Sequence, residues 1–286
     1  MEGVLDVLDP RDSRQFAIAI KRLADCLSFG SDRSPFLGSG VEYVQSRHYQ
    51  PGDPVRAIDW RVTARTGKPH IKEYEAPKRL PCWLLIDTSA SMVTGSQPKT
   101  KYAQALHIAG GLAYACLDRM SPVGVLGIGE RAFRVEPSLS RQQVLEWLLR
   151  LRHYRYDEGT SLGRRASELA ARLNSRALII VLSDLHTGDG IAPLKQLGQK
   201  NDVVVVQLRD PAERSLRGSG IFRAREAETG RDFVTHGRAR FLDDTELQRD
   251  LKRAGVDRFV VDTDQPFAHR LRHFFLSRAL LGKGAR

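Results

Sequence analysis

The sequence contains no long hydrophobic run. Its longest uninterrupted apolar stretch extends from Ala177 to Leu182, which is far shorter than the roughly 18 to 20 residues that a membrane-spanning helix needs. The first residues, Met1 to Asp12, carry acidic side chains and a proline, whereas a signal peptide begins with basic residues followed by an apolar segment. We therefore expect a cytoplasmic protein without a membrane span.

Cysteine is also scarce. The three cysteines, Cys26, Cys82 and Cys116, form no C-x-x-C pair, which argues against a disulfide framework and against a structural zinc site and favours small, buried, reduced side chains. The sequence also lacks the G-x-x-x-x-G-K-[ST] pattern of P-loop nucleotide-binding sites and the H-E-x-x-H pattern of zinc hydrolases. These absences disfavour an enzymatic function.

Positive charge, in contrast, is abundant. The 286 residues include 45 lysines and arginines against 34 aspartates and glutamates, so the formal net charge is +11. Such a charge suggests an acidic partner: a nucleic acid, an anionic membrane or an acidic protein. Charge alone does not choose among these three classes.

Beyond Pro81, short apolar runs alternate with helical patterns. Runs of four to six apolar residues without polar alternation are typical of strands that helices cover on both faces. We predict strands at 83–86, 123–128, 132–135, 177–182, 203–208 and 258–261, and helices at 101–117, 141–151, 162–173, near 194, at 245–254 and at 266–281. This order predicts a doubly wound α/β domain with a mostly parallel, Rossmann-like sheet.

The region before Pro81 has a different character. Apolar positions at helical spacing predict an N-terminal helix between Ser13 and Phe29, and the glycines and prolines that follow predict turns and short strands outside the main sheet. We therefore divide the chain into an appendage of residues 1–80 and an α/β domain of residues 81–286. Within the second part, a turn at 228–230 is expected between two strands of the basic segment 215–240.

The first core strand leads directly into a loop rich in oxygen donors. Asp87, Ser89 and Ser91 follow the apolar run 83–86, at the carboxyl end of a strand, where α/β sheets bind ligands. One carboxylate and two hydroxyls suit a hard cation such as Mg²⁺. An ion held mostly by neutral hydroxyls keeps positive charge, so we expect it to accept a Glu or Asp side chain of another protein.

The D-x-S-x-S pattern resembles the metal-ion-dependent adhesion site of von Willebrand factor A domains. By this resemblance Thr160 would add a hydroxyl ligand, and Asp184, after the strand 177–182, would add a carboxylate. The implied site for Mg²⁺ or Mn²⁺ consists of Asp87, Ser89, Ser91, Thr160 and Asp184. Local alternatives exist, since the serines, Thr160 or Ser161 could cap a helix and Asp184 could close a turn.

A second cluster of polar and aromatic residues lies upstream. Arginines and aspartates alternate there around the turn 51–54, with an isoleucine and a tryptophan between them, which predicts a salt-bridged loop with an aromatic anchor. Its members are Arg47, Tyr49, Asp53, Arg56, Asp59, Trp60 and Arg65. A structural clamp on the α/β domain and a partner-binding surface both agree with this pattern, and we favour the clamp.

These motifs together resemble a bacterial family called domain of unknown function fifty-eight. The resemblance rests on Arg47-x-Tyr49, the segment from Gly52 to Trp60, Ala64-Arg65 and D-x-S-x-S, and it includes Asp210-Pro211-x-Glu213. It implies a von Willebrand factor A-like protein that acts with a MoxR-type AAA+ ATPase in chaperone-like assembly or maturation of client proteins. No enzymatic reaction comes with the family.

We therefore expect a non-enzymatic, metal-dependent protein-interaction module with the ATPase and an acidic client as partners. Two other classes stay open: a basic nucleic-acid-binding protein, suggested by the segment 209–240, and a metal-dependent hydrolase that uses Asp87 and Asp184. A phosphoryl-transfer site would also need a cationic clamp and a positioned base, which the sequence does not reveal. The apolar side of 266–281 could touch a membrane, but docking on the sheet is the interpretation we favour.

Overall fold

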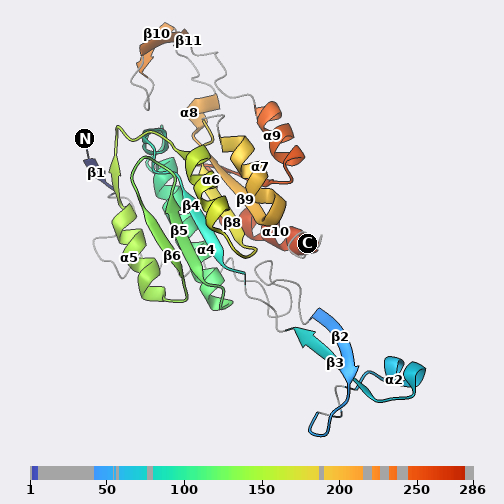
Figure 1. The fold of residues 1–286 in the computed structure, drawn as a ribbon. Helices are drawn as coiled ribbons and strands as arrows, with labels where there is room; N and C mark the ends of the chain where they lie inside the picture. The colour runs from blue at the N-terminus through green and yellow to red at the C-terminus, as the bar shows by residue number, and fades with distance from the viewer. Residues whose placement is uncertain are drawn as a thin grey trace.

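The structure is a computed structural model that describes residues 2–5, 42–53, 55, 58–75, 80–186, 190–214, 221–225, 232–236 and 244–280. A six-stranded sheet with the strand order β12-β9-β8-β4-β5-β6 forms its centre (Figure 1). The strands are β4 (Cys82–Ile86), β5 (Val123–Gly127), β6 (Arg134–Ser138), β8 (Leu178–Ser183), β9 (Asp202–Arg209) and β12 (Asp257–Asp262). Only β6 runs antiparallel to its neighbour, so the predicted α/β class with a mostly parallel sheet is confirmed.

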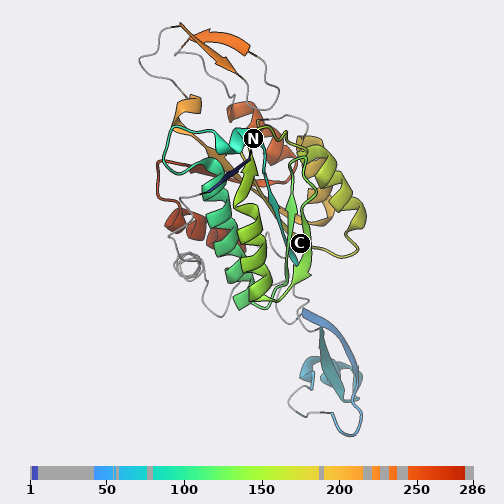
Figure 2. The same ribbon diagram turned by 90° about the vertical axis from the view of Figure 1, so that its left-hand side faces the viewer.

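Helices cover both faces of this sheet. On one face lie α4 (Lys101–Asp118), α5 (Arg141–Leu151) and α10 (Ala268–Leu280), and on the other lie α6 (Leu162–Arg172), α7 (Ile191–Lys200) and α9 (Asp244–Arg253). Figure 2 shows the sheet between α4 and α5 on one side and α6 on the other. Leu271 and Phe275 of α10 are core residues, which confirms that this helix docks its apolar side on the sheet.

The strand sequences explain why two layers of helices are needed. Successive side chains of a strand point to opposite faces, and in β4 the side chains of Leu84 and Ile86 join the core under α4, whereas Trp83 and Leu85 join the opposite core. An apolar residue at every position therefore requires cover on both faces. The unbroken apolar runs of the sequence are the direct cause of the three-layer fold.

Helix α4 is the most deeply buried helix of the first face. The side chain of Thr100 caps its start by accepting a hydrogen bond of 3.1 Å from the N–H of Ala103. Nearly every later position of the helix is buried, and so is its first residue, Lys101. Because that lysine is 1% exposed, its charge must be compensated inside the protein.

Smaller elements flank this domain. Strand β1 (Glu2–Val4) pairs with β7 (His153–Arg155), and β10 (Ile221–Arg225) pairs with β11 (Asp232–His236), both antiparallel. The two strands expected in the basic segment are thus confirmed, whereas the turn at 228–230 lies outside the described residues. Strands β2 (Glu42–His48) and β3 (His70–Glu75) pair with each other beside α2 (Trp60–Thr66), and both ribbon views draw this unit beyond the layers of the main sheet (Figures 1 and 2).

The N-terminal helix expected at 13–29 and Cys26 lie outside the described residues. Cys82 and Cys116 are buried and free, as expected for reduced core residues. Across the described part of the chain, none of the helices combines the length and the apolar character that crossing a membrane requires.

Candidate functional site

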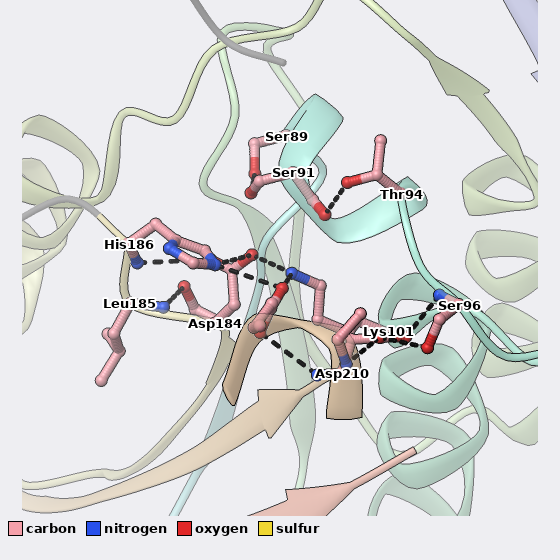
Figure 3. A network of polar contacts seen from close by, with 12 residues as sticks. Ser89, Ser91, Thr94, Ser96, Lys101, Asp184, Leu185, His186 and Asp210 are labelled. Atoms are coloured by element: carbon pink, nitrogen blue, oxygen red, sulfur yellow. Dashed lines mark hydrogen bonds and ion pairs between the residues drawn. The ribbon is translucent and has the colours of Figure 1, made fainter. Parts of the chain in front are cut away.

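Three strand ends bring polar residues together at one edge of the sheet. Strands β4, β8 and β9 are parallel neighbours. Their last residues are followed directly by Asp87, Asp184 and Asp210. Parallel strands end at the same edge, where α/β proteins bind ligands. Figure 3 shows this edge, where the loops after β4 and β8 meet the short helix α8 (Pro211–Arg214).

The D-x-S-x-S loop directs its first carboxylate inward. Asp87 is 2% exposed; one carboxylate oxygen accepts a hydrogen bond of 3.1 Å from the N–H of Ser89, and the other accepts one of 2.5 Å from the Ser183 hydroxyl. The hydroxyl oxygens of Ser89 and Ser91 lie 3.0 Å apart. Ser89 stands at the N-cap of α3 (Ala90–Val93), but its side chain makes no capping hydrogen bond. Helix capping therefore does not explain this serine.

The loop that carries Thr160 is fastened to the D-x-S-x-S loop. The carbonyl of Glu158 accepts a hydrogen bond of 2.7 Å from the N–H of Ala90, and its carboxylate accepts one of 2.7 Å from the Thr88 hydroxyl. The buried hydroxyl oxygen of Thr160 has no hydrogen-bond partner among the described residues. Ser161 is the N-cap of α6, and its side chain makes no capping hydrogen bond either. Since buried polar groups are nearly always paired, the Thr160 hydroxyl is a group that a bound ion would satisfy.

Sequence reasoning missed Glu158, although this residue joins the two loops. Its carboxylate also accepts a hydrogen bond of 2.6 Å from Nε of Arg131. The backbone of Gly129 passes so close that a Cβ atom there would lie 2.2 Å from both the Glu158 carboxylate and the Thr88 hydroxyl. A glycine at this position is therefore a requirement of the contact between the loops.

An ion cluster around the buried Lys101, which sequence reasoning also missed, lies beside the loops. The ammonium nitrogen of Lys101 is 2.7 Å from a carboxylate oxygen of Asp184 and also pairs with Glu213 of α8 (Figure 3). Nε2 of His186 lies 3.5 Å from the Asp184 carboxylate and 3.3 Å from that of Glu213. The ligand atoms of Asp184, His186 and Glu213 lie within 4.8 Å of one another, a spacing that a metal ion could bridge if the ammonium moved.

These charges determine the protonation of the site. Burial and the nearby charge of Asp184 raise the pKa of Asp87 to about 7. Burial alone would raise the pKa of Asp184, but Lys101 and His186 outweigh burial and hold that pKa below its ordinary value. Burial would lower the pKa of Lys101, and the carboxylates of Asp184 and Glu213 outweigh it, so this pKa is raised. Asp184 and Lys101 are thus an ionised pair, whereas Asp87 pairs with no cation among the described residues.

Asp210 holds the rim of the site in place. Its carboxylate accepts hydrogen bonds from the N–H and the hydroxyl of Ser96, at 2.8 and 2.5 Å, and one of 2.9 Å from the N–H of Ala212. Its own N–H donates to the second carboxylate oxygen of Glu213 at 3.2 Å. The Asp210-Pro211-x-Glu213 segment, for which the sequence indicated no role, therefore positions a charged partner of Lys101.

Two of the proposed donors have the spacing of neighbouring ligands of a hard divalent cation. Adjacent oxygens in an octahedral Mg²⁺ shell of roughly 2.0–2.1 Å radius are about 2.9 Å apart, and the Ser89 and Ser91 hydroxyls are 3.0 Å apart. Thr160 adds a hydroxyl oxygen that has no hydrogen-bond partner among the described residues. Asp87 adds a carboxylate that pairs with no cation of those residues. The ammonium on Asp184 is the feature that opposes metal binding.

Comparison with known families identifies the chain. The sequence profile of a family described as "Protein of unknown function DUF58" matches residues 45–253. The chain belongs to the DUF58 family. The resemblance found in the sequence motifs is thereby confirmed, and because the family is one of unknown function, membership assigns no activity.

The relatives of this DUF58 chain include uncharacterized proteins. One from Mycobacterium bovis and those from two strains of Mycobacterium tuberculosis are each 26% identical over 293 residues, which covers 96% of this chain and 92% of the relative. A crystal structure of an uncharacterized membrane-spanning protein from Vibrio fischeri matches with 17% identity and a TM-score of 0.21, over 70% of this chain and 96% of that one. A TM-score this low supports no argument about fold or function.

The second predicted cluster lies in the appendage of the DUF58 chain. The guanidinium of Arg47 donates two hydrogen bonds of 2.8 Å to the carboxylate of Asp53. The carboxylate of Asp59 accepts a hydrogen bond of 2.8 Å from the Ser46 hydroxyl and caps the start of α2, and the N–H of Tyr49 donates to the carbonyl of Pro69 at 2.9 Å. The salt-bridged loop is present, and these contacts hold it to its own strands.

The predicted aromatic anchor is wrong. Trp60 is 68% exposed, because the ion pair and the helix cap, rather than aromatic packing, hold the loop. Arg65 is exposed and has no hydrogen bond or ion pair in the described part of the chain, and Arg56 lies outside that part. The structure places this unit beyond the amino end of β4, so it does not bring the appendage cluster to Asp87 (Figure 1).

Proposed function

We propose that this DUF58 protein is a non-enzymatic interaction module that binds a partner protein through a divalent cation. The residues proposed to hold Mg²⁺ or Mn²⁺ are Asp87, Ser89, Ser91, Thr160 and Asp184. The observation that carries the proposal is the buried hydroxyl of Thr160, which has no hydrogen-bond partner among the described residues and lies on a loop tied to the D-x-S-x-S loop. A sheet of the von Willebrand factor A type, with an adhesion-type metal site at its carboxyl edge, is part of this proposal.

The chemistry of the donor set explains why a partner carboxylate is the expected ligand. When bound, the ion supplies a positive centre that can take an external oxygen ligand in place of water. Three of the five proposed ligands, the hydroxyls of Ser89, Ser91 and Thr160, bring no charge, and an ion with about six ligands keeps a position for water beside these five. A Glu or Asp side chain from another protein can take that position, which favours a partner carboxylate.

The proposed partners follow from the family resemblance and from charge. A MoxR-type AAA+ ATPase and an acidic client would meet a chain with a net charge of +11, and such complementarity speeds association. We place this activity in chaperone-like assembly or maturation of clients in the cytoplasm. A nucleic-acid role depends on the basic segment 209–240, half of which lies outside the described residues.

The buried position of Lys101 weighs against the hydrolase alternative. Phosphoryl transfer needs a cationic group that touches the substrate, and the side chain of Lys101 is 1% exposed and paired with two carboxylates. Turnover of generic phosphate esters by the Mg²⁺-loaded protein, lost in Asp87→Ala, would favour the hydrolase instead.

Calorimetric titration of Mg²⁺ and Mn²⁺ into chelator-treated protein tests the metal site. We expect saturable binding that Asp87→Ala and Asp184→Ala abolish. Thr160→Val, which removes the hydroxyl at nearly constant volume, should weaken binding about tenfold or more, whereas Thr160→Ser keeps the hydroxyl and should bind like the wild type. Absence of saturable binding at millimolar metal would exclude the proposal.

Co-purification tests the partner. Capture of the purified AAA+ ATPase or client by the wild-type protein should require Mg²⁺ and be lost in a chelator. Equal capture by Asp87→Ala would show that partner binding does not use the ion.

A further inference from the structure

Lys101 is a buried cation for which the proposed function supplies no role. Its ammonium is enclosed between Asp184, which follows β8, and Glu213, which belongs to α8. Lysine is rarely buried at this depth unless it is paired, and here it is paired with a carboxylate that is also a proposed metal ligand.

A metal ion and the ammonium of Lys101 would use the same carboxylate, that of Asp184. Its Oδ2 accepts the hydrogen bond of 2.7 Å from Lys101, and its Oδ1 accepts a longer one of 3.4 Å from the N–H of His186. Both carboxylate oxygens are therefore engaged. Two cations at one carboxylate repel each other, so a divalent ion that uses Asp184 disfavours the ammonium at its present position.

Glu213 provides the ammonium with a second carboxylate. Lys101 contacts Glu213 while it is paired with Asp184, and its four-carbon stem is flexible. The N–H of Asp210 holds the other oxygen of Glu213 at 3.2 Å, so this acceptor stays in place if the ammonium leaves Asp184. The lysine can give up one partner without entering water or losing its last counter-charge.

We propose that Lys101 competes with the divalent ion for Asp184, and that Glu213 receives the ammonium when the ion binds. This inference rests on the proposed function and adds regulation to it: the chain carries its own cation, which neutralises Asp184 in the absence of metal and sets the metal concentration at which the site fills. Ion binding is thereby coupled to α8, since Glu213 belongs to that helix.

Two substitutions with opposite expected effects test this inference by titration of Mg²⁺ and Mn²⁺ into chelator-treated protein. Lys101→Met keeps the stem and removes the competing charge, so the dissociation constant should fall about tenfold or more. Glu213→Gln removes the receiving carboxylate and confines the ammonium to Asp184, so the dissociation constant should rise several-fold. Lys99→Met is the matched control, because it removes one exposed positive charge two residues away and should leave the affinity almost unchanged.

The outcomes separate this inference from the proposed function. If the wild type binds the ion and Lys101→Met binds it with equal or lower affinity, the competition is overturned while the metal site stands. If Lys101→Met does not fold, Glu213→Gln decides, and an unchanged affinity in that variant overturns the inference. If neither the wild type nor the variants bind the ion saturably, the proposed metal site and the competition are both excluded.

Discussion

Two buried charge clusters lie at opposite ends of the same sheet. At the amino ends of β9 and β12, the guanidinium of Arg278 pairs with Asp202 and lies 2.8 Å from a carboxylate oxygen of Asp257. An arginine is a planar fork with fixed donor directions, and here different nitrogens serve the two carboxylates. Arg278 thereby ties two adjacent strands to α10. The chain itself supplies both the cation and the carboxylates of this cluster.

The cluster at the carboxyl ends is built differently. One flexible ammonium, that of Lys101, serves Asp184 and Glu213. The buried carboxylate of Asp87 accepts hydrogen bonds from a hydroxyl and an amide. On the adjoining loop, the Thr160 hydroxyl has no hydrogen-bond partner among the described residues. Similar residue types thus stabilise a fold when the chain completes their pairing, and form a candidate binding site when it does not.

The largest effect is expected at the amino-end cluster. Arg278→Met removes the guanidinium that pairs with the carboxylates of Asp202 and Asp257, which should lower the free energy of unfolding by about 3–5 kcal/mol. Urea denaturation should show the same loss with and without Mg²⁺. If Mg²⁺ restored the lost stability, the amino-end cluster would depend on the ion and would not be completed by the chain alone.

A smaller effect is expected at the contact between the two site loops. In Gly129→Ala the new Cβ would overlap Glu158 and Thr88, which should cost about 1–3 kcal/mol of stability and weaken Mg²⁺ binding by separating Thr160 from the serines. Thermal unfolding and calorimetry measure the two effects. Gly198→Ala in α7 is a control, since its Cβ would approach no atom closer than 3.3 Å; an equal loss of metal affinity there would argue against a specific role for the loop contact.

The carboxyl-end cluster should also make stability depend on pH. The pKa of Asp87 is raised from 3.8 to about 7 in the folded protein, so its protonated form stabilises the fold at low pH, and this contribution is lost as the pH rises through 7. Between pH 6 and 8 the metal-free protein should lose about 1 kcal/mol. Mg²⁺ should abolish this loss by neutralising the carboxylate. Thermal melts that show the same pH dependence with and without Mg²⁺ would contradict the assignment.

An exposed ion pair provides the baseline for both clusters. Arg155 and Asp157 are paired at 3.1 Å on side chains that are about half exposed. Solvent screening makes such pairs weak, so Arg155→Ala should not change the midpoint of thermal unfolding measurably, with or without metal. A clear shift would mean that surface charge contributes to the effects assigned to burial.

Part of the candidate site could be predicted because its residues are local to strand ends. Asp87, Ser89 and Asp184 each follow an apolar run, and parallel strands bring such ends to one edge. Lys101, Glu158 and Glu213 could not be predicted in this way. Lys101 reaches a partner 112 positions away, and Glu158 one 70 positions away, and no periodicity or spacing connects residues so distant.

The layered α/β fold follows from the sequence, since unbroken apolar runs need cover on both faces of a sheet, and so does the set of strand ends that carry oxygen donors. Which of these donors keep a partner depends on the tertiary structure. Within the described residues it places an ammonium on Asp184, provides no hydrogen-bond partner for the Thr160 hydroxyl and exposes Trp60. The physical reason is that burial and charge pairing depend on contacts between distant segments, whereas hydrophobic patterning acts along the chain.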